Sequence, residues 1–443
     1  MDMRPEETPS RVPETAKQHG ETRNRWGWVE RAAWTERMLA ALESGVKGNV
    51  WFSLIDKVFS ERNLYAAAAK VIGNGGASGV DRITVEQYES DLDRNVRHLS
   101  GQLRDGSYRP RAVQRVHIPK PGSRETRPLG IPTVQDRVAQ GAVRQVLEPI
   151  FEKEFAEHSY GFRPGRGCKD ALREVDKLLK TGHVYVVDAD LKAYFDTIPH
   201  AQLMRRVGER IADGRVLALI ESFLKADIMD GLRDWTPEAG APQGAVLSPL
   251  LSNIYLNPLD HLLASRGWKM VRYADDFVIM CRSAEEAHEV LQVVQQWTIE
   301  NGLTLHPTKT RIVDARKEPL DFLGYRFDQG KRFPRLKSRQ KFQDTIRAKT
   351  KRANGNSLSM IIADLNPTLR GWFAYFQHCH KYVFLGLDSW IRGRLRNILR
   401  KRRGLRGRAR GDDHHRWPNK YFASHGLYSL VKAHAEACRS SRR

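Results

Sequence analysis

The chain has 443 residues, which is enough for two to four domains with sizeable hydrophobic cores. Its 74 Lys and Arg outnumber its 52 Asp and Glu, and the net charge of +22 favours nucleic acid or an anionic membrane as a partner. No apolar run reaches the roughly 18 residues of a membrane-spanning helix, and residues 1–20 lack the apolar stretch of a signal peptide. We therefore expect a cytoplasmic, bacterial-type protein that associates with nucleic acid and not with a membrane.

The four cysteines are dispersed and include no Cys-x-x-Cys pair, which argues against a zinc ribbon or finger and suits a reducing compartment. The first part of the chain is predicted to be mainly helical. Breakers such as Gly73-Asn74-Gly75-Gly76 separate its segments. The predicted elements are a disordered stretch over 1–25, helical patterns over 29–42 and 49–71, a polar helix from Thr84, a short strand over 111–119 and a helix over 136–155.

The middle of the chain alternates strands and helices, and its character changes after about Phe333. Strand signals then fade, and long basic helical segments follow, so we place a domain boundary near 328–340. The predicted elements before it are a strand over 184–191, helices over 201–226 and 284–300, an apolar helix over 247–262 interrupted by Pro258, a hairpin over 269–281, and short strands over 312–313 and 322–327.

The sharpest local motif is Tyr273-Ala274-Asp275-Asp276, which lies between apolar strand segments. A buried strand would not tolerate two adjacent carboxylates, so the pair is expected at the tip of a tight hairpin. Neighbouring carboxylates raise each other's pKa, and a divalent cation such as Mg²⁺ removes that penalty. The alternative is an ordinary turn, in which Asp is a common residue.

A second acidic cluster, Asp188-Ala189-Asp190, ends the apolar strand that begins at Val184. With Asp190 facing the hairpin, three carboxylates could hold two metal ions about 4 Å apart, one activating a primer hydroxyl and the other steadying the leaving diphosphate. Asp188 is expected to be a neighbour that makes local hydrogen bonds. The sequence therefore favours two-metal phosphoryl transfer.

The motifs, taken together and in order, resemble the group II intron-encoded reverse transcriptase/maturase family over roughly residues 45 to 440. Asp190–Asp196 is similar to the segment with the first catalytic aspartate, and Tyr273–Asp276 matches the family's Tyr-Ala-Asp-Asp signature. Further similar segments are the fingers hairpin from Ile118 to Pro132, Ser159–Gly165, Ala241–Gly244 with Leu247–Asn253, Gly302-Leu303 with Lys309-Thr310, and Phe322–Tyr325.

This resemblance implies an α+β right-hand polymerase, with fingers and palm built on antiparallel sheet, followed by an all-helical thumb/maturase domain. It implies two Mg²⁺ ions, with Mn²⁺ as a possible substitute. The implied catalytic residues are Asp190, Asp275 and Asp276, and the implied metal ligands are Asp190, Leu191, Asp275 and Asp276. The implied nucleotide-binding residues are Lys120, Arg127, Phe195, Gln243 and Lys309, with Phe195 excluding a 2′-hydroxyl by its bulk and the cations clamping the triphosphate. For Phe195 the alternative is a core aromatic, and for the cations it is generic surface charge.

The last third of the chain is strongly basic. Residues 331–352 and 391–410 each hold ten Lys or Arg, with one acid in the first stretch and none in the second. Most of the aromatic residues between them have helical spacing and are expected in a core, whereas the charges favour a polyanion. The expected nucleic-acid contacts are Arg392, Arg394, Arg396, Arg400, Lys401, Arg402 and Arg403.

Residues 365–376 resemble the family's thumb or maturase domain, and Arg416–Phe422 with Leu427–Leu430 resembles the segment that ends members without an endonuclease domain. The expected divisions are an N-terminal extension over 1–44, fingers and palm over 45–330, a helical thumb/maturase domain over 331–400 and a basic DNA-binding segment over 401–443.

The implied function is RNA-directed DNA polymerisation, with binding of the intron RNA to assist splicing and support of intron mobility by target-primed reverse transcription. The expected partners are the group II intron RNA, an RNA template with a DNA primer, target DNA and deoxynucleoside triphosphates. Two alternatives remain open, namely a free-standing reverse transcriptase in repair or defence, and an RNA-binding splicing cofactor without polymerase activity. The intact aspartates argue against the second.

Overall fold

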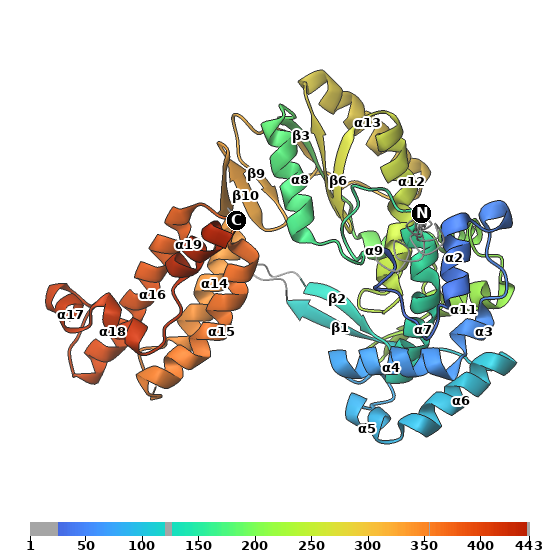
Figure 1. Cartoon of the computed structure of the whole chain (residues 1–443), viewed down its shortest axis with the longest axis horizontal. Coiled ribbons are helices and arrows are strands. Elements are labelled where there is room, and N and C mark those ends of the chain that lie inside the picture. Colours follow the sequence, from blue (N-terminus) through green and yellow to red (C-terminus); the bar gives the residue numbers. More distant parts are fainter. Residues whose placement is uncertain (1–24, 120–125, 354, 441–443) are drawn as a thin grey trace, which may run out of the picture.

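The structure is a computed structural model that describes residues 25–119, 126–353 and 355–440. The protein has two lobes, one with the N-terminal helices and two sheets, the other with the C-terminal helices (Figure 1). The disorder expected over residues 1–25 lies outside the described residues except at Arg25. No helix in the described part of the chain is long and apolar enough to cross a membrane.

The N-terminal helices surround α7, which is buried along almost its whole length, and its buried polar residues, such as Asp136 and Gln140, are hydrogen-bonded to other segments. Thr84 and Gln87 form a capping box, in which the Gln87 N–H donates to Thr84 Oγ1 (3.2 Å) and the Thr84 N–H donates to Gln87 Oε1 (2.9 Å), so the helix expected from Thr84 is confirmed. The elements are α2 (Glu36–Ser44), η1 (Lys47–Asn49), α3 (Ile55–Val58), α4 (Glu61–Asn74), α5 (Val85–Ser90), α6 (Leu92–Asp105) and α7 (Val134–Glu152).

A four-stranded sheet with the order β2-β1-β4-β5 lies beside these helices, and we call it the fingers sheet. Its strands are β1 (Val113–Pro119), β2 (Thr126–Ile131), β4 (Ile228–Asp230) and β5 (Arg233–Trp235). β1 and β2 are antiparallel, with Arg115 opposite Gly130 and Ile118 opposite Arg127. The hairpin formed by β1 and β2 points toward the C-terminal lobe (Figure 1).

A second four-stranded sheet with the order β6-β7-β3-β8, the palm sheet, lies at the centre of the larger lobe. Its strands are β3 (Tyr185–Asp190), β6 (Lys269–Tyr273), β7 (Asp276–Cys281) and β8 (Arg311–Asp314), and each pair of adjacent strands is antiparallel. Helices flank it on both sides (Figure 1), with α8 (Cys168–Lys180) on one face and α12 (Ser248–Ser265) and α13 (Ala284–Glu300) on the other. The remaining helices of this part of the chain are α9 (Tyr194–Thr197), α10 (His200–Gly208) and α11 (Gly214–Leu224).

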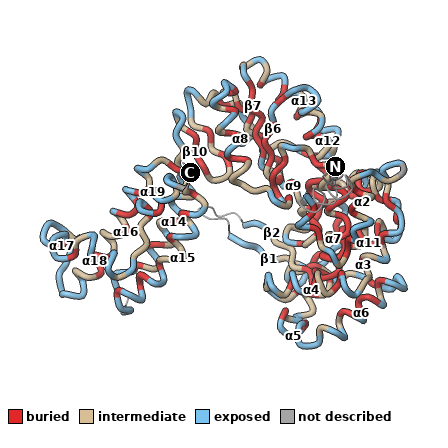
Figure 2. Tube along the Cα trace, viewed as in Figure 1, coloured by how far each residue is buried: buried red, intermediate tan, exposed pale blue. Residues whose placement is uncertain are grey.

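The palm sheet is buried on both faces because its strands are apolar at successive positions. Val187 and Phe277 belong to the core shared with α12, α13 and the N-terminal helices. Val186 and Val278 belong to a second core shared with α8 and the C-terminal lobe. Figure 2 shows buried residues running along α7 and along strands β6 and β7. The sheet therefore joins the two cores and is the rigid platform of the molecule.

Several predicted elements differ in detail from the observed ones. The helix expected to break at Pro258 continues through it, because α12 is buried on most sides and its packing offsets the missing N–H. Residues 201–226 form two helices because Asp213 caps the second, accepting from the Arg215 and Val216 N–H groups. The stretch expected as one helix over 49–71 is η1, α3 and α4, and the strand expected over 322–327 is a hairpin that turns at Leu323-Gly324.

A small antiparallel sheet follows the palm sheet in the chain, and the helices after it form the C-terminal lobe, which we call the thumb. The sheet has the order β11-β10-β9, with β9 (Leu320–Phe322), β10 (Tyr325–Asp328) and β11 (Lys331–Pro334). The thumb helices are α14 (Leu336–Lys349), α15 (Leu358–Phe376), α16 (Lys381–Arg402), α17 (Gly411–Arg416), α18 (Asn419–Ser424) and α19 (Leu430–Ser440). The thumb aromatics expected in a core are partly confirmed: Phe373 and Phe376 are buried, whereas Tyr382 is 66% exposed.

The segment after Arg400 packs against the thumb. Trp417, Phe422 and Leu430 are buried in the same core as Phe384 of α16. The Asp388 carboxylate accepts hydrogen bonds from Ser429 and from the backbone N–H of Leu430 and Val431. The expected division at residue 401 therefore does not coincide with a break in packing, because residues 413–433 complete the hydrophobic core of α15 and α16.

Candidate active site

Two of the predicted catalytic aspartates lie directly opposite each other on neighbouring strands. Asp190 is the last residue of β3, Asp276 is the first of β7, and the two are paired in the sheet register. Asp275 lies just before Asp276, in the two-residue turn Ala274-Asp275 that joins β6 to β7. Because side chains alternate along a strand, Asp188, Asp190 and Asp276 share one face of the palm sheet, the face toward the thumb. The hairpin expected over 269–281 is confirmed, with its acidic residues at the tip.

The turn that carries Asp275 packs against residues 160–161, a segment distant in sequence. Ala274 adopts a left-handed backbone conformation (φ 61°). Gly161 approaches this turn so closely that an added Cβ would lie 2.2 Å from the Ala274 nitrogen, so only glycine fits there. The Tyr160 N–H donates to the Arg272 carbonyl (2.8 Å), and the Asn253 amide donates to the Gly161 carbonyl (2.8 Å). These contacts give the motif around Ser159–Gly165 a physical role, which is to position the turn that carries Asp275.

Arg272 is a positioning residue that sequence reasoning missed. Its guanidinium is fully buried, donates twice to Asp260, and donates also to Asn253 Oδ1 and the Ala274 carbonyl (2.9 Å each). It thus joins the catalytic turn to α12. The available signal was a charged residue inside an apolar strand, which requires a buried partner.

The aspartates repel one another. Desolvation by the surrounding protein, followed by repulsion from Asp188, Asp275 and Asp190, raises the pKa of Asp276 to about 7, although part of Asp276 is exposed at the surface. Burial also raises the pKa of Asp275 and of Asp188, and Arg127 and Arg311 act in the opposite direction on them. Such a cluster of carboxylates is stabilised by bound cations.

Two cations, one in the segment that leads into β8 and one at the first residue of β8, lie beside the aspartates. Lys309 Nζ is 2.6 Å from Asp190 Oδ2, and Arg311 Nε is 3.6 Å from Asp188 Oδ2. The His306 N–H donates to the Asp190 carbonyl (2.7 Å), and the Lys192 N–H donates to the Thr304 carbonyl (2.8 Å). These two bonds hold the segment that carries Lys309 against the end of β3.

The donor set is compatible with a hard divalent cation, because it consists of carboxylates that desolvation and mutual repulsion destabilise. Among the described residues, no three Asp, Glu, His or Cys side chains are grouped closely enough to hold a metal ion by themselves. The Leu191 side chain is buried in the core, so only its backbone carbonyl could serve as a ligand. The backbone hydrogen bonds that join this strand end to residues 304–306 use the Asp190 carbonyl and the Lys192 N–H. The Leu191 carbonyl takes part in neither of these two bonds.

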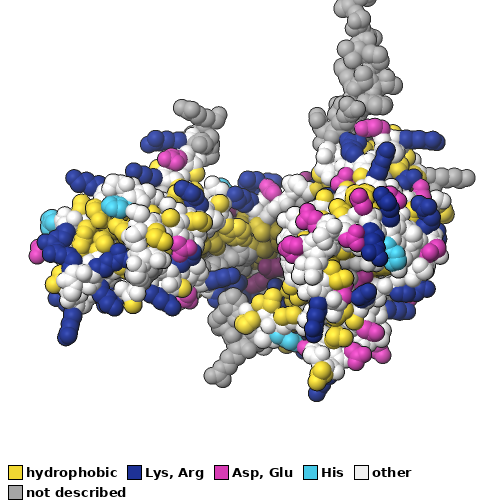
Figure 3. All heavy atoms as spheres, turned by 90° about the horizontal axis from the view of Figure 1, so that it is seen from below, with side chains coloured by type: hydrophobic (Ala, Val, Ile, Leu, Met, Phe, Trp, Pro, Cys, Tyr) yellow, Lys and Arg dark blue, Asp and Glu magenta, His cyan; other side chains and the backbone are white. Residues whose placement is uncertain are grey.

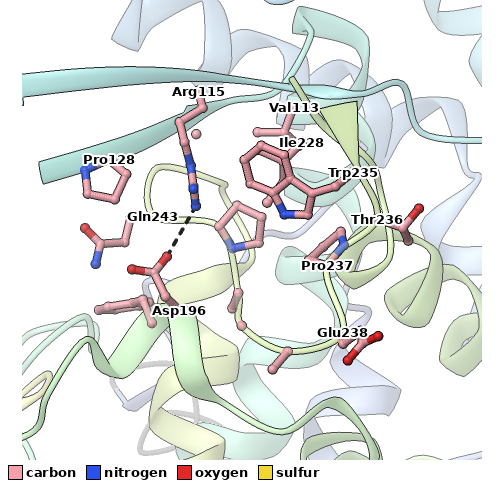
Figure 4. Close-up of a pocket in the computed structure, with 16 residues that line it drawn as sticks. Val113, Arg115, Pro128, Asp196, Ile228, Trp235, Thr236, Pro237, Glu238 and Gln243 are labelled. Atoms are coloured by element: carbon pink, nitrogen blue, oxygen red, sulfur yellow. Dashed lines mark ion pairs between the residues drawn. The ribbon is translucent and has the colours of Figure 1, made fainter. Parts of the chain in front are cut away.

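The residues predicted to bind the nucleotide come from several segments, and two of them, Phe195 and Gln243, lie close together. Phe195 is half-buried on α9, with its ring centroid 6.5 Å from that of Phe162. The Gly130 N–H donates to the Gln243 carbonyl (2.6 Å), which holds the loop before α12 against β2. Phe195 and Gln243 both line a cavity of about 420 Å³ between the fingers sheet and α9 (Figure 4). Arg127 lies near enough to Asp275 to influence its pKa, and Lys120 lies outside the described residues.

The predicted nucleic-acid contacts on α16 fall into two groups. Four arginines make contacts within the thumb: Arg392 with Asp388 (3.7 Å), Arg394 with Thr350 (2.5 Å), Arg396 with the Trp417 carbonyl (2.9 Å) and Arg400 with Asp413 (2.6 Å). Arg396 is only 4% exposed, so its guanidinium serves the core of the lobe. Lys401, Arg402 and Arg403 are exposed. Figure 3 shows Lys and Arg side chains across the thumb and acidic side chains in the hollow between the lobes.

A palm sheet with opposed aspartates, a fingers sheet above it and a helical thumb define a right-hand nucleic-acid polymerase. Residues 118–327 match the family model for reverse transcriptase (RNA-dependent DNA polymerase), and residues 339–417 match that for the maturase-specific domain of group II introns. The chain belongs to the family of reverse transcriptases and maturases encoded by group II introns.

Individual relatives are similar over different shares of their length. Protein YkfC of Escherichia coli (strain K12) is 33% identical over 312 residues, covering 61% of this chain and 81% of YkfC. The group II intron-encoded protein LtrA of Lactococcus lactis subsp. cremoris is 37% identical over 208 residues, covering 47% of this chain and only 34% of LtrA. Among solved structures, a chain of a partial Cas6-RT-Cas1–Cas2 complex is 28% identical in sequence, with a TM-score of 0.37. The match covers 56% of this chain and 41% of the chain in the complex.

Proposed function

We propose that this protein extends a DNA primer on an RNA template, with Asp190, Asp275 and Asp276 as its catalytic residues. The observation that carries this proposal is the direct pairing of Asp190 with Asp276 at the ends of β3 and β7, beside the turn that holds Asp275. Two Mg²⁺ ions, when bound there, would lower the pKa of the primer hydroxyl and stabilise the leaving diphosphate. Mn²⁺ is a possible substitute for them.

The residues around the aspartates have roles that follow from their positions. The carboxylates of Asp190, Asp275 and Asp276 would hold the ions, with the Leu191 carbonyl as a further oxygen donor. Phe195 would lie under the sugar and exclude a 2′-hydroxyl, and Gln243 would contact the nucleotide or template. Lys120, Arg127 and Lys309 would hold the triphosphate by charge.

The proposed second role is binding of a group II intron RNA to assist its splicing and mobility by target-primed reverse transcription. The match of residues 339–417 to the maturase-specific domain supports this role, as do the exposed cations Lys401, Arg402 and Arg403 at the end of α16. Phosphates would be the main contacts, since exposed Lys and Arg neutralise them without reading sequence. Target DNA would bind through the same basic surface, and these partners would keep the protein in the cytoplasm at the nucleoid.

Primer extension on poly(rA) with oligo(dT) tests the polymerase role. Asp190→Ala or Asp275→Ala should abolish DNA synthesis because each removes a metal ligand, whereas Asp314→Asn on the neighbouring strand β8 should leave synthesis intact. Binding of the intron RNA, measured with the same variants, should be unchanged because it depends on surface charge. Undiminished synthesis by both alanine variants would overturn the assignment of the active site.

A further inference from the structure

An ion pair joins the fingers sheet to the helix that carries Phe195. Arg115 Nη2 on β1 lies 3.6 Å from Asp196 Oδ1 on α9. The same guanidinium lies over the Trp235 ring of β5, 5.0 Å from its centroid. Figure 4 shows Arg115 extending from the fingers sheet into the cavity, between Trp235 and Asp196. One side chain therefore connects β1, β5 and α9.

Strand register places this pair on the opposite face of the fingers sheet from the triphosphate-binding cation. Arg115 lies opposite Gly130 and Arg127 lies opposite Ile118, so Arg115 and Arg127 are on different faces because the register positions alternate. Arg127 is the residue whose charge reaches Asp275. Arg115 lines the same cavity as Phe195, and its guanidinium is engaged by Asp196, so it would act on the nucleotide through the adjacent Phe195.

The helix α9 is short and depends on its anchors. It has four residues and begins after Ala193, whose backbone is left-handed (φ 49°). The Ala241 N–H donates to the Phe195 carbonyl (2.7 Å), and the Gly240 N–H donates to the Ile198 carbonyl (2.8 Å). These bonds fix the backbone of α9 on one side. The Asp196 side chain is its link to the fingers sheet.

We infer that Arg115 is a positioning residue for sugar discrimination, because its pairing with Asp196 sets where the adjacent Phe195 ring lies beside β3. The inference rests on the proposed function and deepens it. The substrates that it separates are deoxyribonucleoside and ribonucleoside triphosphates. A ring displaced by a fraction of an ångström leaves more room for a 2′-hydroxyl, so discrimination depends on a pair of residues that the nucleotide does not touch.

The test compares Arg115→Gln, Asp196→Asn and the double variant in single-nucleotide primer extension. The ratio of kcat/KM for dNTP to that for rNTP should fall roughly tenfold in each single variant. The double variant should fall no further, because both single changes break the same pair. Arg115→Lys keeps a cation at this position and should retain much of the wild-type dNTP-to-rNTP ratio. Arg233→Gln, an exposed cation on β5 of the same sheet, is the matched control and should leave the ratio unchanged.

The outcomes separate this inference from the proposed function. The wild-type protein must extend the primer and Phe195→Val must lower the ratio, and failure of either result contradicts the proposed nucleotide pocket itself. With both satisfied, an unchanged ratio in Arg115→Gln overturns the inference. Weakened primer–template binding in Arg115→Gln without any effect of Asp196→Asn also overturns it, because Arg115 would then contact nucleic acid directly. Equal melting temperatures of all variants, with the change confined to the ratio, support positioning over a general loss of structure.

Discussion

Arg272 and Asp260 form a bidentate ion pair in the interior of the palm, with Nε 2.8 Å from Oδ1 and Nη2 2.5 Å from Oδ2. Their side chains are 0% and 5% exposed. The pair connects β6, near the turn that carries Asp275, to α12, which follows the loop that carries Gln243. The position of the aspartates and the position of the nucleotide loop are therefore coupled through one buried ion pair.

Removing one partner of this pair should destabilise the protein strongly. Asp260→Asn leaves the Arg272 guanidinium buried without its counter-charge, and such a change costs about 3–5 kcal/mol. Urea unfolding of the isolated protein measures it. Glu221→Gln, which removes the exposed pair between Glu221 and Lys225 (2.7 Å), is the control and should cost at most about 1 kcal/mol. Equal small losses in the two variants would show that the buried pair does not hold the palm together.

The bulk of Phe195 should decide which sugar is accepted. Phe195→Val opens space where a 2′-hydroxyl would lie, so the kcat/KM ratio for dNTP over rNTP should fall by roughly 10- to 100-fold. The measurement is single-nucleotide extension with each substrate. Phe52→Val, at a ring that is 66% exposed, is the control and should leave the ratio unchanged. An unchanged ratio in the Phe195 variant would assign that ring to the core alone.

Lys309 should compete with metal for Asp190. Its ammonium lies 2.6 Å from the Asp190 carboxylate, and both side chains are partly exposed. Exposed pairs contribute about 0.2–1 kcal/mol, so Lys309→Met should lower the half-saturating Mg²⁺ concentration for primer extension by at most about fivefold. Lys317→Met, which removes an exposed cation 3.8 Å from Asp314 on the same sheet, should leave it unchanged. A higher Mg²⁺ requirement in Lys309→Met would show that Lys309 supports the metal site instead.

The hairpin with Asp275 and Asp276 could be predicted because adjacent carboxylates are tolerated only where apolar strands end. That Asp190, at the end of its own strand, could face this hairpin was also expected, and the strand register places Asp190 opposite Asp276. The support of the turn by Gly161 could not be predicted, since the turn lies far from it in the sequence. For Arg272 the sequence indicated only that a buried partner was needed, and not that Asp260 and Asn253 would supply it. Local sequence shows how charged a segment is, and tertiary contacts decide which charges reach solvent.

The arginines of α16 illustrate the same limit. Arg396 and Arg403 belong to one basic run, yet Arg396 is 4% exposed whereas Arg403 is exposed. The difference arises because Trp417 and Asn419, some 20 residues later, accept hydrogen bonds from Arg396 (2.9 Å each). A helix surface that looks uniformly basic in sequence is thus divided by the segment that folds back onto it.

This packing determines what a truncation after Arg400 should do. The cut removes Trp417, Phe422 and Leu430 from the thumb core. Burial of each such side chain contributes about 1.5–3 kcal/mol, so the loss is comparable to the whole stability of a typical domain, about 5–15 kcal/mol. It also removes the partners of the buried Asp388 and Arg396. The truncated chain should therefore melt at a markedly lower temperature and lose primer extension and DNA binding together.

The matched variant keeps the packing and removes only charge. Arg403, Arg406 and Arg408 are exposed, and their combined replacement by Gln should leave the melting temperature and primer extension unchanged. Binding to target DNA should weaken, and the slope of log affinity against log salt should become shallower by about 0.9 for each phosphate that is no longer neutralised. A truncated chain with an unchanged melting temperature and full primer extension would contradict this account, since residues 401–443 would then form a separate DNA-binding segment. Measuring thermal stability, primer extension and salt-dependent DNA binding on both proteins separates charge from packing, because only the truncation removes the core residues.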